Sequence, residues 1–254
     1  MRYKQARLFF FFLIVLSILP AGLGMIHPFV VILPLIAFIL LLAAASFEIR
    51  MNFYLNSVNR GPDRMEVSIT FDDGPDPENT PKILELLREH DIKAVFFCTG
   101  KAAAQYPGII RQMLSEGHEI GNHTYTHSNF FDFYTVSKMA DEISDTEKVI
   151  AKISGKKPDY FRPPYGVTNP ALARALSFFN YIVVGWTFRT YDLKKDGIDG
   201  VIRRLEKNLR KGSILVFHDH NRNIHEILLA SIGFIRNMGY DIVPLKKMID
   251  GRQV

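Results

Sequence analysis

The stretch TFDDGP at residues 70–75 decides the fold class of this chain. Residues 67–71 lead into it and alternate apolar and polar side chains, as a half-buried β-strand does. Gly74 and Pro75 are typical turn residues, so Asp72 and Asp73 lie where a strand ends in a loop. Neighbouring side chains on a strand point to opposite faces, so the two carboxylates can serve one site only if the chain bends there. A simple acidic turn is the alternative.

Strand-like and helix-like segments alternate along the chain from about residue 65 onward. We predict further strands at 94–98, 118–121, 160–162, 181–186, 214–217 and 241–243, and helices at 82–90, 107–116, 135–155, 169–177, 200–211 and 225–238. About seven such units predict an α/β fold with a mostly parallel sheet, either open or closed into a barrel. In such folds the reactive residues gather at the carboxyl ends of the strands.

The strand at 118–121 leads to two histidines four residues apart, His123 and His127. One helical turn would place both imidazoles on the same side. Two imidazoles and one carboxylate are an established ligand set for a catalytic divalent metal. A surface pair of histidines is the alternative, which the Asp pair at another strand end makes less attractive.

Three more predicted strands end at residues that can carry chemistry. Arg162 begins the stiff turn RPPYG at 162–166 and is placed to pair with a carboxylate. Asp192 follows the strand at 181–186, and His218 comes directly after the strand at 214–217. A solvated arginine and a structural histidine are the alternatives. The single cysteine, Cys98, excludes an intrachain disulfide, and we assign it to packing.

In this order, TFDDGP (70–75), HTYTH (123–127), RPPYG (162–166) and LVFHD (215–219) resemble the motifs of NodB-homology polysaccharide deacetylases, carbohydrate esterase family 4. The resemblance covers about residues 65–249. It implies a distorted (β/α) barrel of about seven units and metal-dependent hydrolysis of an N-acyl group on an amino sugar.

The resemblance also implies roles for the residues in the first three motifs. Asp73, His123 and His127 would hold one divalent metal ion, commonly zinc and sometimes cobalt, nickel or manganese. Asp72 would be the general base that takes a proton from the attacking water. Arg162 would pair with Asp72 and keep it ionised and oriented.

The remaining roles concern the leaving group and the oxyanion. His218 would be the general acid that protonates the leaving amine, and Asp192 would hold its imidazole in position. The backbone N–H of Tyr165 would stabilise the oxyanion. The family pattern of the fourth motif is Trp-x-x-Asp-x-x-Asp-Trp, but this chain reads WTFRTYDL at 186–193. Arg189 and Leu193 thus replace an Asp and a Trp that normally lines the acyl pocket, which leaves the acyl-group preference open.

The N-terminal part of the chain is apolar enough to enter a membrane. Residues 8–47 contain no Lys, Arg, Asp or Glu, and these 40 residues are twice the roughly 20 that span a bilayer. The turn residues at 20–24 and Pro28 divide them into 8–19 and 29–47. We predict a hydrophobic helical hairpin in a membrane anchor at 1–50, a linker at 51–64 and the deacetylase domain at 65–254. A cleaved signal peptide is the alternative for the first segment.

Charge predicts the sidedness of this anchor. Arg2, Lys4 and Arg7 favour a cytoplasmic N-terminus, and two spans would return the chain to the cytoplasmic face. If only one segment spans, the domain faces outward. Of the net charge of +5, residues 1–50 carry +3, and no basic stripe suggests nucleic acid as a partner.

Together these features predict a membrane-anchored, metal-dependent hydrolase that removes an N-acyl group, in the first instance N-acetyl, from an amino sugar. The sugar would belong to a polysaccharide or to a lipid-linked saccharide. An O-acetyl esterase on the same scaffold is the first alternative. A non-catalytic membrane protein that binds glycan or acts as a scaffold is the second.

Overall fold

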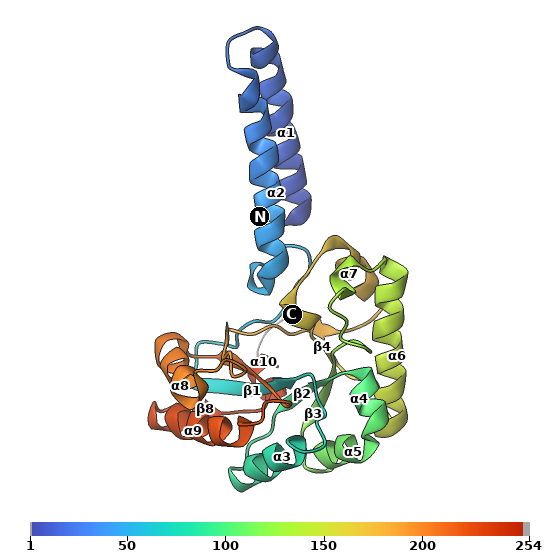
Figure 1. Ribbon diagram of the computed structural model, residues 1–254, viewed down its shortest axis with the longest axis vertical. Coiled ribbons are helices and arrows are strands. Elements are labelled where there is room, and N and C mark those ends of the chain that lie inside the picture. Colours follow the sequence, from blue (N-terminus) through green and yellow to red (C-terminus); the bar gives the residue numbers. More distant parts are fainter. Residues whose placement is uncertain (1, 251–254) are drawn as a thin grey trace.

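The computed structural model describes residues 2–250 as a curled, all-parallel sheet flanked by helices, with a two-helix stalk at one end (Figure 1). Met1 and residues 251–254, the outer ends of the predicted anchor and domain, lie outside the described residues. The strands are β1 (Glu66–Asp72), β2 (Val95–Cys98), β3 (Glu119–Asn122), β4 (Tyr160–Phe161), β5 (Ile182–Val183), β6 (Phe188–Arg189), β7 (Ser213–His218) and β8 (Asp241–Ile242).

The strands lie in the order β5-β4-β3-β2-β1-β7-β6, and β8 pairs with the start of β1. The domain helices are α3 (Thr80–Glu89), α4 (Gly100–Gln105), α5 (Pro107–Ser115), α6 (Val136–Ser154), α7 (Pro170–Leu176), α8 (Gly197–Asn208), α9 (Ile224–Asn237) and α10 (Leu245–Ile249). The predicted α/β fold, a distorted barrel, is confirmed as a curled half-barrel. The short elements β6, α4 and α10 were not predicted.

Both faces of the central strands are buried, as expected for a parallel sheet covered by helices. Along β2, Phe96 and Cys98 belong to the core beneath the outer helices, whereas Val95 and Phe97 belong to a second core on the other face. The side-chain period of two along a strand produces this division. Cys98 is fully buried, in agreement with the packing role predicted for it.

Residues 51–64, predicted as a linker, pair with the sheet. Val58 pairs with Val184, just after β5, and Arg60 pairs with Ser213 at the start of β7. The N–H of Gly61 also donates to the carbonyl of Gly212 at 2.7 Å. The segment therefore bridges β5 and β7, which stand at opposite sides of the curled sheet.

The stalk consists of α1 (Tyr3–Gly22) and α2 (Ile32–Phe47), joined through the short 3-10 helix η1 (Pro28–Val31) (Figure 1). We expected the first segment to end at Pro20, but α1 continues through Pro20 to Gly22. A proline removes one backbone donor, which a helix tolerates near its end, and the hydrogen bond from Leu23 N–H to Leu19 O at 3.0 Å shows that the helical bonds resume beyond it.

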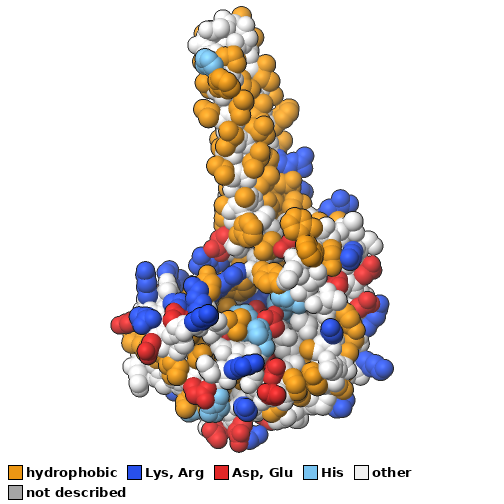
Figure 2. All heavy atoms as spheres, viewed as in Figure 1, with side chains coloured by type: hydrophobic (Ala, Val, Ile, Leu, Met, Phe, Trp, Pro, Cys, Tyr) orange, Lys and Arg blue, Asp and Glu red, His pale blue; other side chains and the backbone are white. Residues whose placement is uncertain are grey.

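The two stalk helices are long and apolar enough to cross a membrane. The spans Tyr3–Gly22 and Pro28–Phe47 each contain 20 residues, with mean hydropathies of 1.8 and 2.8. Only 6% of the most apolar part of each is buried within the molecule, unlike the core helix of a soluble protein. The predicted hydrophobic hairpin is therefore present, and its surface is largely uncovered apolar side chains (Figure 2).

Candidate active site

Most of the predicted reactive residues line one cleft at the carboxyl ends of the strands, while Arg162 and Asp192 are buried behind Asp72 and His218. This active cleft encloses about 480 Å³, within the range of small-molecule binding sites. Figure 2 shows His side chains gathered in the middle of the domain, below the stalk. The lining residues are Asp72, Asp73, His123, His127, Tyr165, Trp186, Arg189, Tyr191, Leu193, Lys194, Val216, His218 and His220.

The two neighbouring aspartates serve different parts of this cleft. Asp72 is the last residue of β1, and the chain turns at Asp73, which has a left-handed φ of 76°. The bend that we expected from Gly74 and Pro75 thus begins one residue earlier. As a result, the carboxylate of Asp72 faces Arg162, while that of Asp73 faces His123 and His127.

Asp73, His123 and His127 form a group that could hold a metal ion. Oδ1 of Asp73 lies 3.4 Å from Nε2 of His123 and 3.2 Å from Nε2 of His127. One ligand atom from each residue lies within 4.8 Å of the others. Nδ1 of His123 lies 2.7 Å from the carbonyl oxygen of Arg162, to which only a protonated nitrogen can donate. Nε2 therefore keeps its lone pair for a metal, as is usual for metal-bound histidine.

The helical turn that we expected between the two histidines is wrong. Residues 123–127 form a loop in which Thr124 has φ 65° and His127 has φ 49°. These two left-handed residues reverse the chain, so the imidazoles converge with ring centres 4.9 Å apart. The spacing of four brings the rings together here through loop geometry rather than through a helix.

The protonation states around this group suit a cation. Burial would raise the pKa of Asp73, but the hydrogen bond to His123 and the charges of the histidines hold it below its usual range. Burial and the charge of His123 lower the pKa of His127 to about 4, which leaves its imidazole neutral. Burial would also lower the pKa of His123, but Asp72 and Asp73 raise it, since the site favours positive charge at that ring. The residues present thus fit a divalent metal.

Asp72 is held by the fully buried side chain of Arg162. Nη1 of Arg162 donates to Oδ1 of Asp72 at 2.6 Å and to Oγ1 of Thr70 at 2.8 Å. Its Nε and Nη2 donate to the carbonyl oxygens of Val184 and Gly185. These bonds fix the guanidinium, so Asp72 is oriented by a cation that cannot move or lose its proton.

His218, at the end of β7, is the neighbour of Asp72 in the sheet, because the two residues pair in the register of β1 and β7. Its Nδ1 lies 2.9 Å from Oδ1 of Asp192, and its backbone N–H donates to Oδ2 at 3.0 Å. Burial would lower the pKa of His218, but Asp192, with smaller contributions from Asp72 and Asp73, raises it to about 9. A protonated imidazole therefore stands beside the oriented carboxylate of Asp72.

Tyr165 enters the cleft from the turn after β4. It has a left-handed φ of 56°, and its ring lies against that of His127, with centres 4.8 Å apart. Its backbone N–H makes no hydrogen bond among residues 2–250, so it can serve a ligand. The guanidinium of Arg189, which replaces the Asp of the family pattern, donates to the carbonyl of Tyr165. Leu193, which replaces the Trp, is half exposed and lines the cleft.

Several contributors to the site were not singled out from the sequence. Thr70 accepts from Arg162, and Thr190 donates to the carboxylate of Asp192 at 3.1 Å. His220 lies with Nδ1 3.5 Å from Oδ2 of Asp73. The motif of Thr70 and the strand end of His220 were visible in the sequence. The contact of Thr190 with Asp192 depends on the position of Thr190 beside β7, and no pattern in the sequence indicated it.

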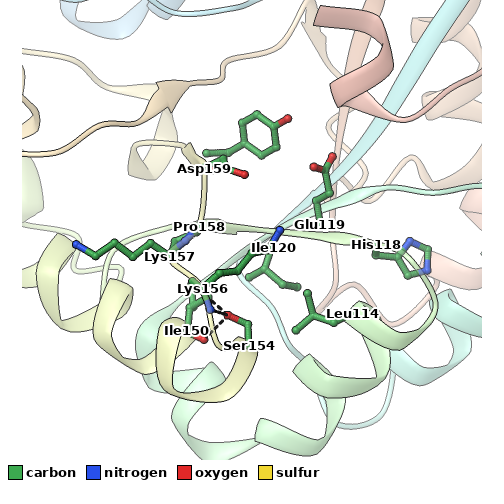
Figure 3. A pocket seen from close by; sticks show the side chains of 11 residues that line it. Leu114, His118, Glu119, Ile120, Ile150, Ser154, Lys156, Lys157, Pro158 and Asp159 are labelled. Carbon is green, nitrogen blue, oxygen red and sulfur yellow. Dashed lines mark hydrogen bonds between the residues drawn. The ribbon is translucent and has the colours of Figure 1, made fainter. Parts of the chain in front are cut away.

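A second cavity of about 40 Å³ lies at the amino ends of β3 and β4, away from the active cleft (Figure 3). Glu119, Asp159 and Lys156 line it, and the hydroxyl of Ser154 donates to the carbonyl oxygen of Lys156. The nearby His118 is buried, and burial lowers its pKa to about 4. This cavity contains none of the residues predicted for chemistry, and we assign it no role.

Comparison with known proteins places the chain in a family. The family model described as polysaccharide deacetylase matches residues 59–184. A peptidoglycan-N-acetylglucosamine deacetylase of Bacillus cereus is 37% identical over 193 residues, which are 74% of this chain and 70% of that protein. The chain belongs to the polysaccharide deacetylase family. The resemblance noted from the motifs is confirmed, as is the predicted hydrolase class.

Solved structures of other polysaccharide deacetylases share this fold. The Bc1960 peptidoglycan N-acetylglucosamine deacetylase matches with a TM-score of 0.70 and 33% identity, over 77% of this chain and 93% of that chain. BA3943, described as a pseudoenzyme of carbohydrate esterase family 4 from Bacillus anthracis, matches with a TM-score of 0.72 and 26% identity, over 78% of this chain and 70% of that chain. A pseudoenzyme thus shares this fold, so activity depends on the side chains in the cleft.

Proposed function

We propose that this chain is a membrane-anchored, metal-dependent deacetylase that removes the N-acetyl group of an amino sugar. The observation that carries the proposal is the convergence of three groups on one cleft. These are the Arg162–Asp72 pair, the Asp192–His218 pair and the metal-type group of Asp73, His123 and His127. The names of the relatives, which include peptidoglycan-N-acetylglucosamine deacetylases, support the substrate class.

The proposed mechanism assigns one step to each group. A divalent metal ion, zinc in our proposal, would be held by Asp73, His123 and His127 and would polarise the amide carbonyl and acidify water. Asp72, kept ionised by Arg162, takes a proton as the water oxygen attacks the carbonyl carbon. The N–H of Tyr165 stabilises the resulting oxyanion. His218 then donates its proton to the nitrogen as the C–N bond breaks, which gives acetate and a free amine.

Release of amines tests this reaction. The full-length protein, loaded with zinc in detergent, is expected to produce free amino groups from N-acetylglucosamine oligosaccharides. An O-acetyl esterase would instead release acetate from O-acetylated glycan and leave the amine yield at zero. No product from either glycan, and none from a lipid-linked N-acetylglucosamine, would support a non-catalytic glycan-binding protein.

The pH dependence should report His218. Because its pKa is raised to about 9, the imidazolium persists through neutral pH, and kcat/KM is expected to fall as the pH rises through about 9. The raised pKa of His218 also stabilises the folded state. This contribution is fully present below the usual histidine pKa of 6.5 and is lost as the pH rises through about 9. Asp192→Asn should move the alkaline limb of the pH–rate profile to lower pH by about one unit or more. An unchanged limb in that variant would contradict the pairing role of Asp192.

The charge distribution supports a cytoplasmic domain. In Figure 1 the N-terminus and the domain lie at the same end of the stalk, and Tyr3 N–H donates to the carbonyl of Phe53 at 3.0 Å. Arg2, Lys4 and Arg50 therefore lie at the domain end, while the far tip carries no Lys or Arg. Positive charge is enriched on the cytoplasmic side of membrane hairpins. On that face a lipid-linked amino sugar is within reach, whereas cell-wall glycan is not.

Cysteine labelling tests the sidedness. Cys98 is fully buried, so cysteines introduced at exposed sites report instead. With a membrane-impermeant maleimide, Glu89→Cys on α3 should react only in permeabilised cells, and Met25→Cys at the hairpin tip should also react in intact cells. The reverse pattern, or reaction of Glu89→Cys in intact cells, would place the domain outside and favour cell-wall glycan.

A further inference from the structure

A cleft rich in arginine connects the end of the stalk with the active cleft. This basic cleft encloses about 390 Å³ and begins at Phe47, the last residue of α2. Trp186, Arg189 and Tyr191 line both clefts and form the junction between them. Figure 2 shows Lys and Arg side chains beside the His side chains, below the base of the stalk. The rest of the lining consists of Glu48, Arg50, Phe188, Arg204 and Asn208.

Arg189 at the junction, and Lys194 in the active cleft beside it, form no ion pair among the described residues. The guanidinium of Arg189 lies over the ring of Trp186 at 4.6 Å, and the amino group of Lys194 lies over the ring of Tyr191 at 4.3 Å. The other two arginines of the basic cleft are each paired, Arg50 with Glu48 and Arg204 with Asp196. The charge of Arg189 reaches Glu48 only at longer range, and its guanidinium donates a hydrogen bond to the carbonyl oxygen of Tyr165. Arg189 and Lys194 are therefore the cations here that a ligand can contact without breaking an ion pair.

The face of the domain around the stalk carries exposed phenylalanines. Phe133 is 86% exposed in the 3-10 helix η3 (Phe131–Phe133), and Phe178, after α7, is 69% exposed. Thr168 N–H donates to the carbonyl of Ser46 in α2, and the side chain of Asn169 donates to the carbonyl of Asp132. These bonds place η3 and α7 beside the end of α2. Exposed aromatic side chains at the base of an apolar hairpin suit a membrane surface, which brings the basic cleft to the level of the lipid headgroups.

We propose that the basic cleft binds the phosphate that joins the amino sugar to a membrane lipid. Arginine and lysine recognise phosphate by charge-assisted hydrogen bonds, and a neutral glycan would need no such cations. The lipid chain would leave along Phe47 toward the bilayer, while the sugar passes Trp186 and Tyr191 into the active cleft. This inference rests on the proposed deacetylase function and specifies its substrate as a lipid phosphate-linked amino sugar.

Two matched substrates test the phosphate site. The zinc-loaded full-length protein, in phosphatidylcholine nanodiscs, is given N-acetylglucosamine linked to a short prenyl chain either through phosphate or through a plain glycosidic bond. The wild type should prefer the phosphate-linked lipid in kcat/KM. Lys194→Gln and Arg189→Gln should each reduce that preference about tenfold, the effect of losing one charge-assisted contact. Lys195→Gln, which removes an exposed neighbouring charge outside both clefts, should leave the preference unchanged.

The outcomes separate this inference from its alternatives. Equal kcat/KM for the two lipids in the wild type, or an unchanged preference in Lys194→Gln and Arg189→Gln, would overturn it. Nanodiscs that contain phosphatidylglycerol distinguish the source of the phosphate. Should the variants change activity only in those discs, and equally for both lipids, the cations contact bilayer lipids and the proposal is wrong.

Measuring lipid binding directly tests the phosphate site without relying on turnover. Affinity for the two lipids is measured in parallel with the inactive Asp72→Asn protein, with and without Lys194→Gln. If the wild type releases no amine from either lipid, the deacetylase proposal fails. Tighter binding of the phosphate-linked lipid that depends on Lys194 would still support the phosphate site, and equal binding of both lipids would refute it.

Discussion

Asp72→Asn is expected to lower kcat/KM by roughly 10²- to 10⁴-fold, the contribution of a positioned general base. The amide has nearly the shape of the carboxylate but cannot accept the proton of the attacking water. Asp72 does not belong to the group of possible metal ligands, so the zinc content should stay near that of the wild type. Steady-state amine release checks the expected loss of kcat/KM, and metal analysis of the same preparation checks the zinc content.

The same change leaves the guanidinium of Arg162 buried without its carboxylate. Losing one partner of a buried pair costs about 3–5 kcal/mol, so the Tm should fall as well. Asp145→Asn, on the exposed face of α6, is the control and should change neither quantity. Full activity in Asp72→Asn would rule out its role as the base.

His127→Ala is expected to remove the bound metal together with the activity. The imidazole supplies one of only three protein ligands in the proposed site, and loss of groups that merely support such ligands already weakens metal binding by about 10- to 100-fold. We therefore expect zinc affinity to fall by more than that. Metal content after dialysis, measured beside amine release, checks the expectation.

His123→Ala should act in the same way and also destabilise the fold, because His123 is 1% exposed and its removal leaves a cavity. The comparison of the two variants thus separates loss of metal from loss of packing. His225→Ala, on α9 and outside the active cleft, is the matched control and should keep metal and activity. Unchanged metal content in both site variants would refute the metal site.

The strand-end rule explains why much of the site could be predicted from the sequence. Asp72, Arg162 and His218 each stand at or directly after a strand whose apolar pattern was visible, and parallel strands bring their carboxyl ends to one edge. The need for a bend predicted that Asp72 and Asp73 could serve one site, and the family resemblance supplied their separate roles. Their catalytic roles stay predictions that the variants above address.

What the sequence could not provide was loop conformation and contacts between distant segments. Thr124 and His127 adopt a left-handed backbone conformation although neither is a glycine, so the sequence does not indicate the turn that they make. Strand β6 has only two residues, too few for a periodic pattern, yet it positions Arg189 against Trp186. The pairing of Val58 and Arg60 with distant strands depends on the curl of the whole sheet.

The pairing of Val58, Arg60 and Gly61 with the sheet limits how far the domain can move relative to the stalk. A flexible tether would let a domain sweep through a volume that grows with the length of the tether. Here the chain pairs with the sheet at Val58, eleven residues after α2 ends at Phe47, so the domain is held against the stalk rather than joined to it by a flexible linker. In the proposed membrane-bound state, the active cleft would be held at one depth relative to the stalk, and its encounters with a lipid-linked substrate would become a search in two dimensions. A soluble form that begins at residue 65 would lose both the stalk and the hydrogen bonds of Val58, Arg60 and Gly61 to the sheet.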